Sequence, residues 1–247
     1  MVRRMIYQPS GNALEYSDLA CNIYKGCYHA CRYCYVPSST FSKKEEFQND
    51  ITPKENFLNK LRRDINLIIK NKEFPISPVL LSFISDPYQP IEEELGLTRK
   101  TIQMLDVFNY PIKILTKGGE LAQRDFDVLS QNPQNQFGVT LVLLNEDDLK
   151  YWEPNAASAE QRIENLKEAK KKGIKTWLSL EPIIDPKQAL DVIDETNEFV
   201  DFYGVGKLNR YKLDEKINWR EVKEEIKEKL ISLDKEFVIH KDLEEIM

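Results

Sequence analysis

The sequence is poor in glycine, in long apolar runs and in basic charge, and each shortage excludes a class of protein. Nine glycines among 247 residues are too few for a fibrous or low-complexity chain. No apolar run approaches the roughly 20 residues that cross a bilayer. The first eight residues also lack the apolar stretch of a secretory signal. We therefore expect a cytoplasmic protein without membrane contact.

A basic excess is also missing, since 35 Lys and Arg face 41 Asp and Glu, a formal net charge of −6. Proteins that bind the nucleic-acid backbone usually carry such an excess, because phosphate contacts supply much of their affinity. Net charge does not describe how charge is distributed, so a local basic face stays compatible with this composition.

Short apolar runs alternate with longer, charged segments of helical period over most of the chain. Such alternation predicts βαβ units and a parallel sheet covered by helices. The expected strands are residues 20–24, 79–84, 112–115, 137–144, 174–180 and 199–205. The expected helices are residues 56–70, 98–108, 121–129, 159–172, 187–195 and 219–233.

These six βα units are too few for a closed eight-unit barrel. No linker rich in Gly, Ser or Pro, and no internal repeat, interrupts the pattern. The sequence therefore predicts one α/β domain over residues 1–247. We place its core at about residues 18–210 and expect a helical C-terminal extension over about residues 211–247.

Cysteine is absent after residue 34, and all four thiols lie within 14 positions of one another: Cys21, Cys27, Cys31 and Cys34. Three of them crowd into eight residues, which suits a metal or an iron–sulfur cluster better than a disulfide framework. A structural zinc site is the simpler alternative. It usually needs two short ligand pairs from separate loops, and the sequence has no second CxxC pair.

The spacing CxxxCxxC of Cys27, Cys31 and Cys34 resembles that of the radical S-adenosylmethionine (SAM) superfamily. This resemblance implies a partial (β/α)6 TIM-type barrel. It also implies a [4Fe–4S] cluster in which these three thiolates hold three of the four irons and SAM binds the fourth. A reducing electron donor of the flavodoxin or ferredoxin type would supply the electron that cleaves SAM. Tyr33 would pack near the adenine.

Further motifs resemble those of spore photoproduct lyase and its relatives over about residues 18–210. They are residues 22–35, 85–90, 115–118, 153–154 with Arg162, 179–182 and 205–209. The lyase also carries a cysteine near its Ser-Asp motif that returns hydrogen to the product radical. The corresponding strand, residues 79–84, has no cysteine here.

Several of these polar residues follow predicted strands, where α/β barrels place functional groups. The resemblance assigns SAM binding to Ser85, Asp86 and Lys117, and Thr140 falls where a small hydroxyl residue serves SAM. Asp86 would accept hydrogen bonds from the ammonium or ribose, and Lys117 would neutralise the carboxylate. The alternatives are a turn-initiating Asp86 and a solvated Lys117.

Arg162 stands in the first turn of the helix that Ser158 and Gln161 open as a capping box. The helix dipole does not favour a cation there, so we expect a carboxylate partner, or else a surface pair with nearby glutamates. We include Arg162 among the SAM-binding residues. Glu181 and Lys207 are the expected catalytic residues, with Asn209 also facing substrate. His240 is expected to be an ordinary surface or core residue.

The leading hypothesis is thus a radical SAM enzyme that abstracts hydrogen from a nucleobase or nucleic acid. A radical SAM enzyme acting on a peptide or small metabolite is the second. It is less favoured because no further cysteine cluster follows the core. The third is a zinc-stabilised α/β binding protein without catalysis.

Overall fold

The structure, a computed structural model, describes residues 4–81, 83–209, 211 and 217–246. Its main sheet has the spatial order β1-β2-β5-β6-β7-β8-β9-β10, and all neighbours from β2 to β10 run parallel. The strands are β1 (Ile6–Tyr7), β2 (Leu19–Cys21), β5 (Val79–Leu81), β6 (Ile112–Thr116), β7 (Gln136–Thr140), β8 (Lys175–Ile183), β9 (Phe202–Lys207) and β10 (Glu236–Ile239). Strand β1 is antiparallel to β2 at one edge.

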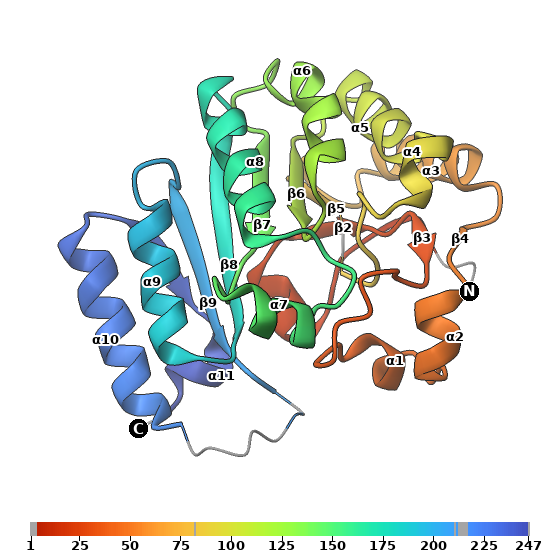
Figure 1. The fold of residues 1–247 in the computed structure, drawn as a ribbon. Coiled ribbons are helices and arrows are strands. Elements are labelled where there is room, and N and C mark those ends of the chain that lie inside the picture. The colour runs from red at the N-terminus through yellow and green to blue at the C-terminus, as the bar shows by residue number, and fades with distance from the viewer. Residues whose placement is uncertain (1–3, 82, 210, 212–216, 247) are drawn as a thin grey trace.

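Helices connect these strands and form an outer layer along the curved sheet (Figure 1). The longer ones are α3 (Phe57–Asn71), α5 (Leu97–Val107), α8 (Ala159–Lys171), α9 (Pro186–Thr196) and α10 (Trp219–Ser232). Shorter ones are α1 (Val36–Ser39), α2 (Lys44–Asn49), α4 (Ile91–Leu95), α6 (Phe126–Leu129), α7 (Glu146–Trp152) and α11 (Lys241–Glu244), with the 3₁₀ segments η1 (Gly11–Glu15) and η2 (Glu120–Asp125). The predicted α/β fold of a partial TIM-type barrel is confirmed.

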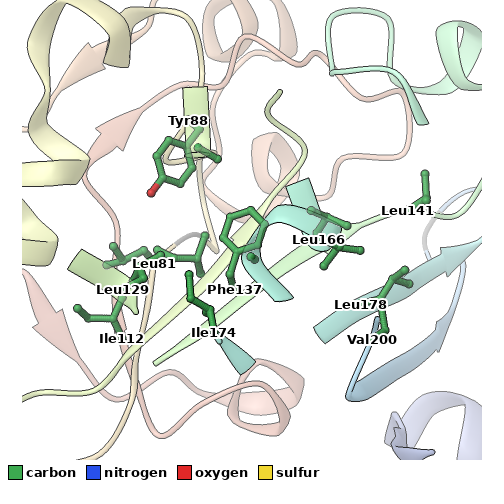
Figure 2. Packing of buried hydrophobic residues seen from close by; sticks show 14 of the residues in the cluster. Leu81, Tyr88, Ile112, Leu129, Phe137, Leu141, Leu166, Ile174, Leu178 and Val200 are labelled. Atoms are coloured by element: carbon green, nitrogen blue, oxygen red, sulfur yellow. The ribbon is translucent and has the colours of Figure 1, made fainter. Parts of the chain in front are cut away.

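The main core lies between the sheet and this outer layer, as the continuous apolar strands predict. Figure 2 shows Leu81, Ile112 and Phe137 from neighbouring strands packed together with helical Leu129 and Leu166. The Phe126 and Phe137 rings meet edge to face, with centroids 4.8 Å apart. None of the helices in the described residues is both long and apolar enough to cross a membrane.

Two predicted strands end earlier than their apolar runs. β5 ends at Leu81, not at residue 84, because the backbone N–H groups of Phe83 and Ile84 donate to the Asn22 side chain. β7 ends at Thr140, not at residue 144, and the N–H of Leu144 donates to Gln188. Residues 83–84 and 141–144 are buried or half-buried outside the sheet, so hydrophobicity alone does not reveal where pairing stops.

The expected strand at residues 20–24 is wrong as one element. Its first part is β2, while Tyr24 and Lys25 form β3, which pairs antiparallel with β4 (Thr52–Pro53). The C-terminal extension is not only helical either, because β10 pairs parallel with β9. That strand is exposed at Glu236 and half-buried over its other three residues, as expected at the edge of the sheet.

Candidate functional site

The cysteine loop lies at the carboxyl edge of the sheet, where the ends of β2, β5, β6 and β7 meet. It follows β3 and contains Cys27, Cys31 and Cys34. The segment between β7 and α8 packs against it, since the N–H of Arg32 donates to the Trp152 carbonyl at 2.8 Å. The segments that follow β2, β5, β6 and β7 therefore bring their polar and cysteine side chains together at this edge.

The backbone of the loop is fixed on both sides of Cys27 and Cys31. Gly26 has φ +75°, and a Cβ there would lie 2.7 Å from the Asp50 carbonyl oxygen. Only glycine fits this close approach, which lets the N–H of Cys27 donate to the Phe47 carbonyl at 2.9 Å. Ala30 is also left-handed, with φ 55°, just before Cys31.

His29 ties the loop to two other segments. Its Nδ1 lies 3.2 Å from the Asn155 carbonyl oxygen, and its Nε2 lies 3.2 Å from Asp86 Oδ2. Asn155 adds two bonds, donating from its backbone to the His29 carbonyl and from its side chain to the Tyr28 carbonyl. Both His29 nitrogens therefore face oxygen atoms, one on the segment after β7 and one on the segment after β5.

The three thiols are desolvated but face groups that favour thiolates. Burial raises the pKa of Cys27 to about 12, and it also raises the pKa values of Cys31 and Cys34. Opposing this, backbone N–H groups of Asp86 and His29 bond the Cys27 sulfur, and the Lys117 ammonium favours the Cys31 and Cys34 thiolates. Cysteine is the ligand type that iron–sulfur clusters use, but among the described residues no three His, Cys, Asp or Glu side chains are arranged as they would be around a metal ion.

Cys21 is separate from this set. It is the last residue of β2, is 1% exposed, and lies beside Leu81 in the sheet. Burial raises its pKa to about 12 as well, and no such thiolate-favouring backbone contact acts on it. Cys21 is a core residue.

Asp86 is fully engaged by protein donors. Oδ1 accepts from the Tyr88 N–H at 2.8 Å and the Thr116 hydroxyl at 2.6 Å. Oδ2 accepts from the Lys117 N–H at 2.7 Å and faces His29. Burial raises the pKa of Asp86, but His29 and the hydrogen bonds outweigh it and hold the pKa at about 2. Asp86 therefore joins the cysteine loop to the end of β6, and a direct bond to SAM would have to displace one of these donors.

Lys117 differs, because its ammonium makes no hydrogen bond or ion pair with the described residues. It lies 5.7 Å from the centre of the Tyr33 ring. Burial lowers the pKa of Lys117, but the Glu153 carboxylate and the Cys31 thiol more than offset this and raise it. A half-buried cation beside the cysteine loop is suited to an anionic ligand group.

Arg162 has the carboxylate partner that its helical position predicts, and the capping box of Ser158 and Gln161 is confirmed. Nη1 lies 2.6 Å from Glu153 Oε2 and donates to the Thr140 carbonyl at 2.9 Å. Both side chains of the ion pair are fully buried, so the surface alternative is wrong. The other Glu153 oxygen accepts from the Tyr33 hydroxyl. Arg162 therefore acts on the cysteine loop through Glu153 and Tyr33.

The remaining predicted residues lie along the same edge of the sheet. Ser85 is buried and donates to the Tyr24 carbonyl at 3.1 Å, and Thr140 is the buried end of β7. Glu181 lies in β8, where its carboxylate accepts from the Tyr16 hydroxyl. Lys207 ends β9, half-buried, opposite Ile183.

Sequence reasoning missed His29, Asn155 and Asn22, which hold this site together, and it also missed Glu15 and Tyr16, which act on Glu181. His29 had a signal, since it lies inside the cysteine loop. Asn155 follows the Glu153-Pro154 motif directly. The contacts themselves span more than 60 positions in sequence, which only the fold reveals.

Comparisons with known sequences agree with this geometry. The family model of the radical SAM superfamily matches residues 21–200. The uncharacterized protein MJ0683 of Methanocaldococcus jannaschii is 32% identical over 184 residues, 74% of this chain and 67% of that protein. The uncharacterized protein ORF301 of Acidianus two-tailed virus is 29% identical over 198 residues, 77% of this chain and 64% of that protein. The chain thus spans only about two thirds of the length of these relatives.

Two groups of solved structures share the fold. Spore photoproduct lyase complexed with dinucleoside spore photoproduct superposes with a TM-score of 0.73 at 15% identity, covering 94% of this chain and 79% of that chain. SuiB of Streptococcus suis bound to S-adenosylmethionine superposes with a TM-score of 0.63 at 11% identity, covering 89% of this chain and 45% of that chain. At these identities the likeness concerns the fold.

Proposed function

Because the chain belongs to the radical SAM superfamily and is a radical SAM enzyme, we propose that Cys27, Cys31 and Cys34 bind a [4Fe–4S] cluster and that SAM binds beside them. The observation that carries this proposal is the free Lys117 ammonium next to three desolvated thiols. When bound, a reduced cluster and SAM together supply a carbon radical that abstracts hydrogen from a substrate.

The protein residues then have distinct tasks. Lys117 binds the SAM carboxylate, and Tyr33, held by Glu153, packs beside the adenine. Asp86 positions the backbone of Lys117 and the His29 side of the loop. Ser85, Thr140 and Arg162 support the same edge through buried hydrogen bonds.

Anaerobic reconstitution with iron and sulfide tests this assignment. We expect a brown protein that forms 5′-deoxyadenosine and methionine from SAM after reduction by dithionite. A colourless protein that binds zinc and leaves SAM intact would contradict the proposal and favour a zinc-stabilised binding protein. A flavodoxin or ferredoxin is the proposed physiological electron donor.

Replacing Lys117 by Met should weaken SAM binding about ten- to hundred-fold, the typical cost of one charged hydrogen bond of about 1.5–3 kcal/mol. Iron content should stay near the wild-type value, because the ammonium holds no protein group by a hydrogen bond or ion pair within the described residues. Equilibrium dialysis with labelled SAM measures this.

Asp86→Asn should differ from Lys117→Met in its effect on iron content. The amide keeps the size of the side chain but cannot accept from all four donors, so we expect partial loss of iron as well as of SAM. Unchanged SAM affinity in Lys117→Met would remove that residue from the site.

For the substrate we propose a nucleobase or nucleic acid, supported by the resemblance to the spore photoproduct lyase subgroup and by the shared fold. A peptide is the second candidate, since a SuiB structure bound to its precursor peptide SuiA also shares the fold, with a TM-score of 0.65.

We predict that the chain does not efficiently repair spore photoproduct. No cysteine follows Cys34, and Cys21 is buried in β2, so no thiol is placed to return hydrogen to a product radical. The reduced enzyme with SAM and a spore-photoproduct dinucleotide should form 5′-deoxyadenosine without releasing thymine. Multiple-turnover conversion to thymines would disprove this prediction.

A further inference from the structure

A second group of buried polar side chains lies where β8, β9 and β10 end, away from the cysteine loop. Glu181 belongs to β8, His240 lies between β10 and α11 as the N-cap of α11, and Glu15 ends η1. Tyr16 follows Glu15 and stacks on the His240 ring, with centroids 4.5 Å apart and an interplanar angle of 17°. Segments from both ends of the chain therefore meet around Glu181.

The position of the proton on His240 follows from its contacts. Glu15 Oε2 accepts from the Lys241 backbone N–H at 2.9 Å and lies 3.0 Å from His240 Nδ1. An ionised Glu15 oxygen only accepts, so Nδ1 carries the proton. Burial lowers the pKa of His240, which keeps the ring neutral. Nε2 is then the unprotonated nitrogen, and its lone pair can accept a proton. His240 is 2% exposed, and Nε2 has no hydrogen-bond partner among the described residues.

This lone pair faces Glu181, whose Oε2 is 3.7 Å away and accepts from the Tyr16 hydroxyl. Two glycines of β9 make room for the pair. A Cβ at Gly206 would lie 2.7 Å from Glu181 Cδ, and one at Gly204 would lie 3.3 Å from His240 Nε2. Strand β9 therefore has glycine at the two positions that face Glu181 and His240, where a larger side chain would collide with them.

Glu181 is more accessible to solvent than His240, because its side chain is 25% exposed while that of His240 is 3% exposed. The arrangement also connects to the cysteine loop. Tyr16 meets the Phe83 ring edge to face at 5.8 Å, and the Tyr35 hydroxyl, next to Cys34, donates to the Phe83 carbonyl at 3.3 Å.

We propose that Glu181, His240 and Glu15 form a proton-transfer series that removes a proton from the substrate. This inference rests on the proposed radical function and adds a base to it. The O–H or N–H bond next to the reacting substrate carbon breaks, and its proton passes to Glu181 Oε1. Glu181 Oε2 and His240 Nε2, which lie 3.7 Å apart, close to hydrogen-bond distance when substrate binds, the Oε2 proton passes to Nε2, and the imidazolium pairs with Glu15. The substrate class is therefore one with such an ionisable hydrogen beside the carbon that loses its hydrogen atom.

The charges around the series support this resting state. Burial, together with Asp242 and Glu15, raises the pKa of Glu181 to about 8, so Glu181 holds its proton at neutral pH. Besides Glu181, the charged groups that face His240 are Glu15 and Asp242, which favour its protonation, and Lys113, which opposes it. Lys113 approaches through its bond to the Tyr16 carbonyl at 2.9 Å.

Nitrogen NMR of the full chain with labelled histidine tests the series without turnover. The chain has two histidines, so His240→Gln assigns the signals. We expect His240 to be neutral and protonated at Nδ1 at pH 7. Its Nε2 signal should shift as Glu181 ionises near pH 8, and Glu181→Gln should abolish that shift. The matched control Glu245→Gln, an exposed carboxylate after α11, should leave both signals unchanged.

A neutral ring protonated at Nε2, or a shift that persists in Glu181→Gln, would overturn the inference. If a variant at Glu181 or His240 fails to fold, infrared spectra of the wild type and Tyr16→Phe decide. The wild type should show a protonated-carboxyl band that is lost near pH 8, and removing the Tyr16 hydroxyl should move that band. Absence of the band would also refute the series. Failure of SAM cleavage with these spectra intact would reject the radical function alone.

Discussion

Cys31→Ala is expected to abolish iron binding and SAM cleavage together. Cys31 is the most deeply buried of the three loop thiols, and each thiolate holds one iron of the proposed cluster. Cys27→Ala and Cys34→Ala should have the same result. Iron and sulfide analysis after anaerobic reconstitution, with 5′-deoxyadenosine as the product assay, measures the loss.

Cys21→Ala is the matched control, because it removes a thiol of the same loop region that lies in the β2 core. It should keep the cluster and its SAM cleavage. A Cys21 variant that loses iron as completely as the other three would show that the ligand assignment is wrong and would restore a four-cysteine site.

Arg162→Met should destabilise the protein by about 3–5 kcal/mol, the usual cost of leaving one partner of a buried ion pair alone. The uncompensated charge would be Glu153, which is fully buried and holds the Tyr33 hydroxyl. The free energy of unfolding in urea, followed by circular dichroism, measures this change. Partial loss of the cluster should accompany it, because Glu153 and Asn155 belong to the segment that packs on the cysteine loop.

The double variant Glu153→Gln with Arg162→Met should recover much of the lost stability, since no buried charge stays unpaired. Lys171→Met, which breaks the exposed pair with Glu168 on the same helix, is the control and should change stability far less. Equal losses in Arg162→Met and Lys171→Met would contradict a structural role for the buried pair.

The sequence by itself determined the superfamily and the fold class. Continuous apolar strands between helical segments predict a parallel α/β sheet, because a strand buried on both faces has no polar alternation. The spacing of Cys27, Cys31 and Cys34 is local, so it is visible without a structure. A carboxylate partner for Arg162 is one of the two expectations that the sequence supports, because the helix dipole does not favour a cation in the first turn, and the structure decides for the buried pair.

Only the tertiary structure decided how these groups are connected. Glu153 pairs with Arg162, Asp86 receives four donors from three segments, and β10 extends the sheet at an edge where hydrophobicity is weak. His240, which the sequence suggested to be an ordinary residue, meets Glu15 across 225 positions. Hydrogen bonds and ion pairs of this kind depend on which loops the fold brings together, and no periodicity along the chain encodes that proximity.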